Sequence, residues 1–431
     1  MFNEVLDESE RNGGKLKEIY LTELDMLDTA IEMETFGITY RHERALELLK
    51  FYQDLMDRHG KRIIDQTWKG FKVGSNKDLG KLFIEDRKYV TIEKTDKGGD
   101  KFDGTQIALW EKEHSDPVCR DILEWKAAKK AVQELDRYEF FYCMEGDRYV
   151  LHPRWKASGA RTGRMSCGDP NLMQMTNVFS GKKRATFETR QRECFGPAPG
   201  RRWYMIDYSQ IEVWLFAFIS GNKTMQDALL TGMDFHGAVA DQVYGDRPGY
   251  ADDKYPWRRR SKLIMFSRLY GGGIMRVAKL INCTYADAKD FVEQWDKLLP
   301  DVKAFIKRLT AKTQREGVII NAFGREYAVE TDRAYKCVNY TIQGTAADVM
   351  KRSLVRVWKR LRSDWPEARL VAAIHDEIII DIPEEYHSKQ LLREILKRMQ
   401  ADQKTLNLPV PLPWKVKWTR NQLLSGKEIG L

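Results

Sequence analysis

The stretch WYMIDYSQIEVWLFAFISG, residues 203–221, determines how this chain folds. Its first four residues are apolar and aromatic, and they predict a buried strand that ends at Asp207. Ser209 and Glu212 have the spacing of a capping box at the start of an apolar helix. A carboxylate at the end of a core strand needs a partner that offsets its desolvation. On this stretch alone, Asp207 is more often a helix cap than a metal ligand.

The composition favours a polyanionic partner. The chain has 431 residues, which suggests two or three domains, and 42% of them are hydrophobic, enough for a core. Lysine and arginine number 72 against 63 acidic residues, a net charge of +9. This excess favours nucleic acid before membrane, with a merely basic soluble protein as the alternative. The acidic N-terminus is unlike a secretory signal and no stretch could span a membrane, so we expect a cytoplasmic protein.

The cysteines are scattered, and none forms a CxxC pair. This distribution argues against a zinc site and against a disulfide framework, and it fits a reducing cytosol. The six are Cys119, Cys143, Cys167, Cys194, Cys283 and Cys337.

A second candidate carboxylate lies in RLVAAI-HDE-IIIDI, residues 369–382, which predicts a hairpin with Asp376 and Glu377 at its tip. An acidic turn is usually only a turn, but both flanking strands are too apolar for a surface hairpin. Two aspartates on two core strands can meet, and paired carboxylates need cations between them. Two Mg²⁺ ions bridging such a pair would form a phosphoryl-transfer site of the kind found in polymerases and nucleases.

A basic helix lies between the two carboxylates in sequence. Arg258, Lys262, Phe266 and Tyr270 follow at steps of four, so they share one broad helix face. A phosphate chain could lie along the cations while a base stacks on the aromatic rings. The alternative is a basic surface helix with a half-buried aromatic edge, which does not explain why charge and aromaticity are segregated.

With these stretches placed, the chain resembles the polymerase module of family A DNA polymerases, the bacterial DNA polymerase I and phage replicative type. Trp214 stands where many relatives have arginine, and Met173 where glutamine is usual, with Gln174 next, a variant closer to the phage branch. The motifs that carry the resemblance are Asp207 to Glu212, Arg258-x3-Lys262-x3-Phe266-x3-Tyr270-Gly271, His375-Asp376-Glu377, Arg161 to Ser166 with Asp169 to Leu172, and Asn339 with Gln343 to Asp348.

The resemblance implies an α+β fold shaped like a right hand, with an antiparallel-sheet palm, helical fingers and a helical thumb. The expected divisions are a mobile N-terminal tail (1–18), a thumb-like helical domain (19–145) with a basic tip near 86–104, a first palm segment (146–221), fingers (222–340) and a second palm segment (341–431). The basic tip is either a solvated loop or a phosphate-contacting one.

The resemblance also implies roles for single residues. Asp207 and Asp376 would bind two catalytic Mg²⁺ ions, with Mn²⁺ as a substitute and Glu377 in support. Arg258, Lys262 and His236 would hold the triphosphate of the incoming nucleotide. Phe266 would pack against the nucleotide, and Tyr270 would stand at the templating position. Glu212 would be a steric gate that excludes a ribose 2′-hydroxyl. Arg164, Asn339, Gln343 and His375 would follow the minor groove of the primer–template, where correct base pairs present similar acceptors.

The leading hypothesis is therefore a template-directed DNA polymerase whose partners are primer–template DNA and dNTPs. An RNA-synthesising or RNA-templated relative and a catalytically silent DNA-binding scaffold are the alternatives. No D-x-E strand motif lies ahead of Leu21, so we expect no built-in proofreading exonuclease. Proofreading lies on another chain, is absent, or the chain is a fragment; Met1 favours a natural short polymerase. A separate proofreading or processivity protein is a further expected partner.

Overall fold

The computed structural model describes residues 15–91, 94–95, 98–175, 190–270, 272–281, 283–423 and 427–428. Its centre is an antiparallel sheet of five strands in the order β12-β11-β6-β10-β9. The central strand β6 is the predicted one, and its residues Trp203 to Ile206 are at most 2% exposed. The strands are β6 (Arg201–Tyr208), β9 (Arg369–Ile374), β10 (Glu377–Pro383), β11 (Trp414–Thr419) and β12 (Lys427–Glu428).

Long helices pack against this sheet and explain why β6, β9 and β10 are buried along most of their length. The hydroxyl of Tyr208 at the end of β6 lies 2.8 Å from Ser353 Oγ and donates to the Met399 carbonyl at 2.7 Å, which ties the strand to two helices. The helices are α2 (Lys15–Phe36), α7 (Ile211–Ser220), α14 (Cys337–Asp364) and α15 (Lys389–Met399). Residues 1–14 of the expected tail lie outside the described residues, and the expectation was wrong for 15–18, which open α2.

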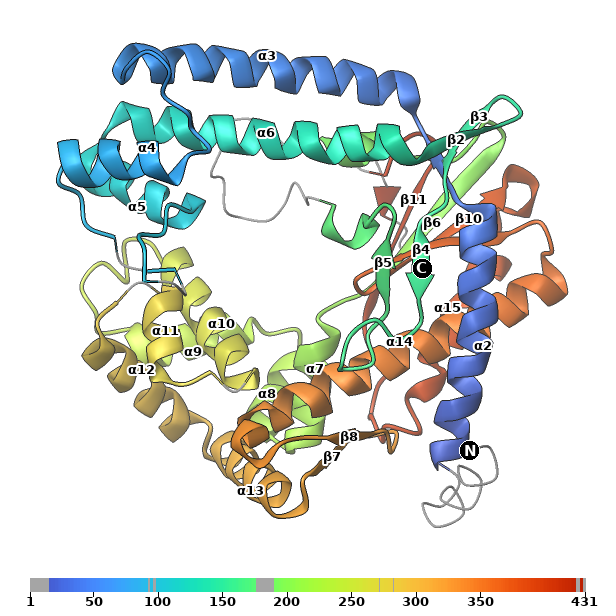
Figure 1. Cartoon of the computed structure of the whole chain (residues 1–431). Coiled ribbons are helices and arrows are strands. Elements are labelled where there is room, and N and C mark those ends of the chain that lie inside the picture. Colours follow the sequence, from blue (N-terminus) through green and yellow to red (C-terminus); the bar gives the residue numbers. More distant parts are fainter. Residues whose placement is uncertain are drawn as a thin grey trace.

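A second unit is built on two long antiparallel helices, α3 and α6, which extend along the top of Figure 1. It has its own core around Phe83 and Trp110. Ser75 caps α4 as predicted, accepting from the backbone N–H of Asp78. Its elements are β1 (Ile38–Tyr40), α3 (His42–Gln66), α4 (Asn76–Gly80), η1 (Lys81–Asp86), α5 (Gly104–His114), α6 (Pro117–Phe141), β2 (Tyr142–Glu145) and β3 (Arg148–Leu151).

The third unit is the predicted helical insertion. A short hairpin, β7–β8, follows its last helix. Helix α14 then runs without interruption across the expected division at 340/341. No Gly or Pro precedes Gly344 in this helix, and packing keeps the helix intact at Gly344. That division was therefore wrong. The elements are α8 (Lys223–Leu230), α9 (Phe235–Tyr244), α10 (Tyr255–Leu269), α11 (Ile274–Ile281), α12 (Tyr285–Leu298), α13 (Pro300–Glu316), β7 (Val318–Ile320) and β8 (Glu326–Ala328).

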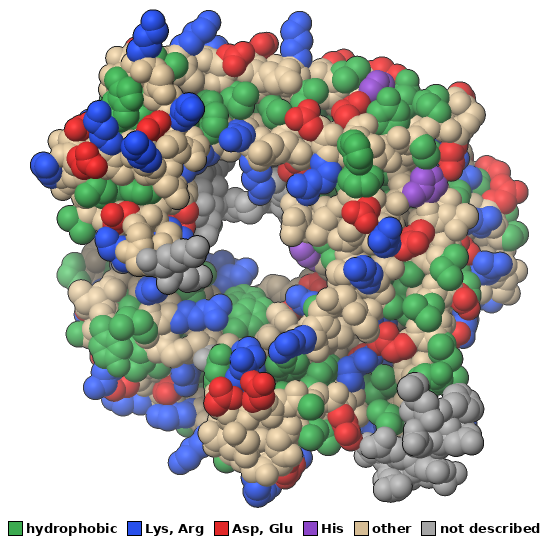
Figure 2. All heavy atoms as spheres, in the orientation of Figure 1, with side chains coloured by type: hydrophobic (Ala, Val, Ile, Leu, Met, Phe, Trp, Pro, Cys, Tyr) green, Lys and Arg blue, Asp and Glu red, His purple; other side chains and the backbone are tan. Residues whose placement is uncertain are grey.

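The three units surround an open space. Figure 2 shows an opening through the middle of the molecule, with Lys and Arg side chains and a histidine at its rim. The remaining elements are β4 (Arg154–Lys156), β5 (Ser166–Gly168) and the short helices η2 (Leu172–Gln174), η3 (Gln191–Cys194), η4 (Thr331–Lys336), η5 (Glu384–Tyr386) and η6 (Gln400–Asp402). The α+β class is confirmed, and within the described ranges no helix is both long and apolar enough to cross a membrane.

Candidate active site

Three carboxylates lie together at one end of the central strands, where β6 ends and β10 begins. In the pairing of β6 with β10, Asp207 stands directly opposite Glu377. His375 and Asp376 form the turn that joins β9 to β10, and the Tyr208 N–H donates to the Asp376 carbonyl at 3.1 Å. His375 takes a left-handed backbone conformation (φ 57°), which allows so short a turn. The predicted hairpin is confirmed, and it lies beside the end of the predicted strand.

These carboxylates are partly buried and their charge is not compensated. Burial raises the pKa of Asp376 to about 6; nearby Arg164 opposes this shift, and Glu212 and Asp207 add to it. Burial also raises the pKa of Asp207, although Lys417, Lys415 and Arg192 pull it down from a distance. Among the described residues, no basic side chain comes within 4.0 Å of the carboxylate of Asp207 or Asp376, whereas other acids in the interior have such partners.

Glu377, the third carboxylate, differs from the other two because a basic side chain lies within ion-pair distance of it. Burial raises its pKa, Arg192 lowers it and Asp207 raises it again. The Nη1 atom of Arg192 lies 3.9 Å from Oε2 of Glu377, at the limit of an ion pair. Negative charge is therefore concentrated at this end of β6 and β10.

The donor set fits a hard divalent cation. Oxygen ligands from one or two carboxylates, completed by water and substrate phosphates, are what Mg²⁺ prefers. Asp207, Asp376 and Glu377 do not bring three ligand atoms within 4.8 Å of one another, so the described side chains do not form a closed cage. An open site that needs substrate oxygens to complete it is consistent with Mg²⁺ and unlike a structural metal site.

Glu212 does not cap α7, and the capping-box prediction was wrong. Gln210 occupies the cap position in a left-handed conformation (φ 56°) and makes no side-chain capping bond. Glu212 instead accepts a hydrogen bond from Arg164 at Oε1 and one from the Tyr270 hydroxyl, at 2.6 Å, at Oε2. A guanidinium brings a full positive charge to the carboxylate, which a backbone N–H cannot, and this explains why Glu212 bonds to Arg164 instead of capping the helix.

Tyr270 connects this group to α14. Burial raises its pKa to about 12, the bond to Glu212 adds to the shift, and a hydrogen bond from Gln343 opposes it. Asn339 lies one helical turn before Gln343, and its buried Oδ1 has no hydrogen-bond partner among the described residues. Arg164, Glu212, Tyr270 and Gln343 thus come together from four separate segments.

A second cluster lies on α9 and α10. Arg258 Nε donates to Asp234 Oδ2 at 2.5 Å. The imidazole of His236 is buried, and neither ring nitrogen has a hydrogen-bond partner within the described residues. Burial lowers the pKa of His236 to about 4, and Lys262 and Arg258 lower it further. Arg258, Lys262 and the imidazole without hydrogen-bond partners would all gain from nearby negative charge. This cluster is therefore suited to bind an anion.

The aromatic half of the α10 face also follows the prediction. The rings of Phe266 and Tyr270 stack with centroids 6.1 Å apart, and Lys262 Nζ lies 5.7 Å above the Phe266 ring. His375 is exposed and, with Arg164 and Asp376, borders a cavity of about 60 Å³. Trp214, the departure from the family pattern, is buried in α7 and stacks on Phe218, so it serves packing.

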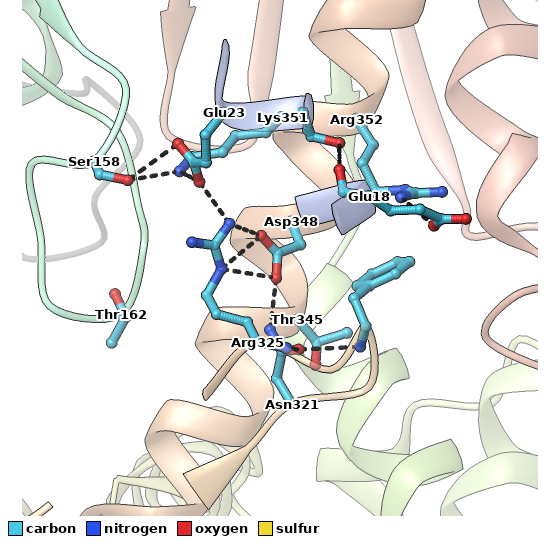
Figure 3. A network of polar contacts seen from close by, with 12 residues as sticks. Glu18, Glu23, Ser158, Thr162, Asn321, Arg325, Thr345, Asp348, Lys351 and Arg352 are labelled. Atoms are coloured by element: carbon cyan, nitrogen blue, oxygen red, sulfur yellow. Dashed lines mark hydrogen bonds and ion pairs between the residues drawn. The ribbon is translucent and has the colours of Figure 1, made fainter. Parts of the chain in front are cut away.

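Sequence reasoning missed the group that holds the Arg164 segment in place. Figure 3 shows a network in which Arg325 binds Asp348 on α14 and Glu23 on α2, with contacts of 2.6 and 2.5 Å. Lys351 binds the same Glu23 at 2.5 Å and donates to Ser158 Oγ at 3.1 Å. A signal was present in the sequence, since Asp348 and Lys351 interrupt an apolar run of α14 and each is at most 2% exposed.

The network reaches the segment that carries Arg164 through several contacts. The Tyr327 hydroxyl donates to the Thr162 carbonyl at 3.2 Å. Gly163 has φ +83°, and a Cβ there would lie 3.5 Å from Arg325 Nε, so this backbone packs directly on the guanidinium. The contacts fix the backbone just ahead of Arg164, the residue that reaches Glu212.

Comparison with known proteins gives a consistent result. The model of DNA polymerase family A matches residues 43–423. DNA polymerase I of Chloroflexus aurantiacus is 28% identical over 411 residues, 91% of this chain and 42% of that protein. The thermostable DNA polymerase I of Thermus filiformis is 28% identical over 402 residues, 89% and 45% of the two chains. The chain therefore spans less than half the length of these relatives.

A solved structure shares the fold. The POL domain of Pol1 from M. smegmatis, in complex with DNA primer-template and dNTP, superposes with a TM-score of 0.84. The alignment covers 96% of this chain and 72% of that one at 22% identity. The expected right-hand architecture, an antiparallel sheet with helical units on either side, is therefore confirmed.

Proposed function

The chain belongs to DNA polymerase family A, and from this premise we propose that it is a template-directed DNA polymerase that adds dNTPs to the 3′ end of a primer. The observation that carries the proposal is the pair of partly buried carboxylates, Asp207 and Asp376, without a cation partner among the described residues. Charge withdrawn from water in this way is costly unless a ligand compensates it, and a perturbed pKa in a cleft is a mark of function.

We assign the regions of the hand as follows. The central sheet with α14 and α15 is the palm, the α3–α6 unit is the thumb, and the α8–α13 unit is the fingers. These assignments follow the observed elements rather than the divisions at 18/19 and 340/341. The opening between the units, with Lys and Arg at its rim, suits a duplex whose phosphates attract positive charge (Figure 2).

Asp207 and Asp376 would hold two Mg²⁺ ions, with Glu377 adding negative charge. When bound, divalent cations at such a pair lower the pKa of the primer 3′-hydroxyl and offset the charge of the departing pyrophosphate. The chain's own contribution is to hold Asp207 at the end of β6 and Asp376 in the adjoining β9–β10 turn, so that little reorganisation is needed at the moment of reaction. The 3′-hydroxyl then attacks the α-phosphate in line, and the bond to pyrophosphate breaks.

The incoming nucleotide would lie along α10. Arg258, Lys262 and His236 would bind its triphosphate, and the unsatisfied nitrogens of His236 support this, because a phosphate oxygen can accept from an imidazole N–H. Phe266 would pack against the base and Tyr270 would stand at the templating position. Glu212, held by Arg164 and Tyr270, would crowd a ribose 2′-hydroxyl and so select deoxynucleotides.

The primer–template would contact Arg164, Asn339, Gln343 and His375 from its minor groove. Amide and guanidinium donors there can test the geometry of a base pair without reading its sequence.

We further propose that these 431 residues carry no proofreading exonuclease. The likeness to a polymerase domain extends over 96% of the chain, which leaves little of it for a second active site. A 3′-mismatched primer incubated without dNTPs should keep its length, and shortening of that primer would contradict the proposal. Proofreading would then be absent or would come from outside these 431 residues, and a separate proofreading or processivity protein is one possible source.

Primer extension tests the main proposal. Labelled DNA primers on DNA and on RNA templates are supplied with dNTPs or NTPs, with and without Mg²⁺. We expect Mg²⁺-dependent addition of dNTPs on the DNA template. Preference for NTPs or for the RNA template would favour the RNA-synthesising or RNA-templated relative. No extension under varied metal and salt would contradict the proposal and favour a silent DNA-binding scaffold.

A further inference from the structure

One face of the β2–β3 hairpin gathers three side chains of kinds that can bind a metal ion. Cys143 and Glu145 are two residues apart on β2, so both point to the same face. Cys143 pairs with Val150, and His152, two residues beyond Val150, therefore lies on that face as well. The thiol sulfur, a carboxylate oxygen and an imidazole nitrogen lie within 4.8 Å of one another, the one such group found among the described residues.

The hydrogen bonding of His152 leaves one ring nitrogen for a cation. Nδ1 lies 2.6 Å from the backbone carbonyl of Glu34, which can only accept, so Nδ1 carries a hydrogen. Nε2 lies 3.0 Å from Oε1 of Glu145, also an acceptor. Two acceptors at this distance need a positive charge between them, which is either a proton or a metal ion.

Further contacts orient these groups as metal ligands usually are. Histidines that bind metals donate their other N–H to a carbonyl or carboxylate, as His152 does to Glu34. Arg148 Nη2 lies 3.2 Å from the second oxygen of Glu145, which turns the first oxygen toward His152. The exposed Cys143 completes a set of sulfur, nitrogen and oxygen atoms, and a thiolate favours zinc over magnesium.

We propose that Cys143, Glu145 and His152 form a site for one Zn²⁺-like divalent cation, with a fourth position open to water. The site is separate from the carboxylates at the end of β6 and does not depend on the proposed polymerase activity. A bound ion would join β2 to the end of β3 and, through His152 and Glu34, to α2. Since α6 runs directly into β2, the ion would stiffen the base of the α3–α6 unit.

The spacing of these residues in the sequence does not predict the group, because a turn separates Cys143 and Glu145 from His152. Scattered cysteines without CxxC pairs argued against zinc, and that argument considers only pairs of cysteines. Strand pairing places a carboxylate and an imidazole beside a single cysteine, a combination that zinc accepts.

Cobalt spectroscopy of the full chain tests the proposal. After treatment with a chelator, the protein is titrated with Co²⁺, whose bond to a thiolate gives a charge-transfer band that Mg²⁺ sites with oxygen ligands cannot produce. We expect one equivalent of Co²⁺ to bind and to produce this band. Added Zn²⁺ should displace the Co²⁺ and remove the band. Cys143→Ser should lose the band, and the matched control Cys283→Ser, which alters another partly exposed cysteine, should keep it.

A second variant covers the case in which Cys143→Ser folds poorly. His152→Gln retains the thiol, and it should weaken Co²⁺ binding more than about tenfold. Zn²⁺ should also raise the Tm of the wild type and of Cys283→Ser, but not of Cys143→Ser. Absence of the band in the wild type, or its persistence in Cys143→Ser, would overturn the proposal and leave an ordinary His152–Glu145 ion pair.

Discussion

Two groups of charged side chains in this molecule are withdrawn from solvent, and they differ in whether opposite charges lie beside them. Glu23, Arg325, Asp348 and Lys351 form a network in which each charged group meets an opposite one within 2.6 Å (Figure 3). Asp207 and Asp376 lie at the end of the central strand and in the turn beside it, and neither has an opposite charge that close among the described residues. The first group is complete without a ligand, whereas the second is not.

The pKa directions express the same difference. Burial alone would raise the pKa of Glu23, but Lys351 and Arg325 reverse the effect and lower it. Burial raises the pKa of Asp376 to about 6, and the opposing influence of Arg164 is too weak to reverse it. The pKa shifts of these two carboxylates thus differ in sign because of the cations around them. Compensated charge indicates architecture, and uncompensated charge indicates a ligand site.

The largest expected effect comes from removing one uncompensated carboxylate. Asp376→Asn keeps the shape but loses the charge that would hold a cation, and primer extension should fall at least about a thousandfold, or ~4 kcal/mol in transition-state stabilisation. Steady-state extension rates with saturating Mg²⁺ measure this. Asp332→Asn, on an exposed segment, is the matched control and should retain its rate. Substantial extension by Asp376→Asn would remove the proposed metal role.

Breaking the compensated group should chiefly affect stability. Arg325→Met leaves Asp348 buried without its guanidinium, and breaking a buried pair in this way costs about 3 kcal/mol. Urea unfolding monitored by circular dichroism measures the loss. The control Arg315→Met alters an exposed arginine on α13 and should change stability by less than about 0.5 kcal/mol. Equal stability of the two variants would mean that the network does not stabilise the fold.

The uncompensated carboxylate should itself cost stability when no metal is present. Folded Asp376 titrates near pH 6 and the unfolded residue near its ordinary 3.8. Between these values the folded state binds the extra proton, so stability falls as pH rises through this window and stays low above it. With EDTA at pH 8, Asp376→Asn should therefore be more stable than the wild type, by on the order of 1–3 kcal/mol.

Thermal unfolding at pH 8 and at pH 4 tests this prediction. The difference between Asp376→Asn and the wild type should shrink at pH 4, where Asp376 is protonated in the folded state. A variant that is no more stable than the wild type at pH 8 would mean that Asp376 is not an uncompensated charge.

Glu212 is an intermediate case, because its charge is compensated within the proposed site by Arg164 and Tyr270. Glu212→Ala should lower discrimination against ribonucleotides by about tenfold, or ~1.4 kcal/mol. The ratio of kcat/KM for dNTP and NTP measures this, with Glu316→Ala, which alters a partly exposed glutamate on α13, as the control. An unchanged ratio would assign Glu212 a purely structural role.

The sequence predicted the elements that depend on local patterns. The strand at 203–206, the HDE hairpin and the face of α10 were all found, because apolar periodicity and turn residues are local properties. It failed where a side chain chooses a distant partner. Glu212 was assigned to a cap three residues away, whereas its partners are 48 and 58 residues away.

The network around Arg325 was missed for the same reason, since its bond to Glu23 joins residues 302 apart. Local patterns could indicate that Asp348 and Lys351 interrupt an apolar helix, but not which cation or anion meets them. The uninterrupted course of α14 was also set by packing rather than by a local stop signal.

A count of bound Mn²⁺ by electron paramagnetic resonance would show whether the uncompensated carboxylates hold cations. The full chain is titrated with Mn²⁺ in the presence of primer–template and a non-reacting dNTP analogue, beside Asp207→Asn and Asp376→Asn. We predict two ions bound by the wild type and a loss of binding in each variant. If both variants bind Mn²⁺ as tightly as the wild type, the uncompensated carboxylates are not the cation site.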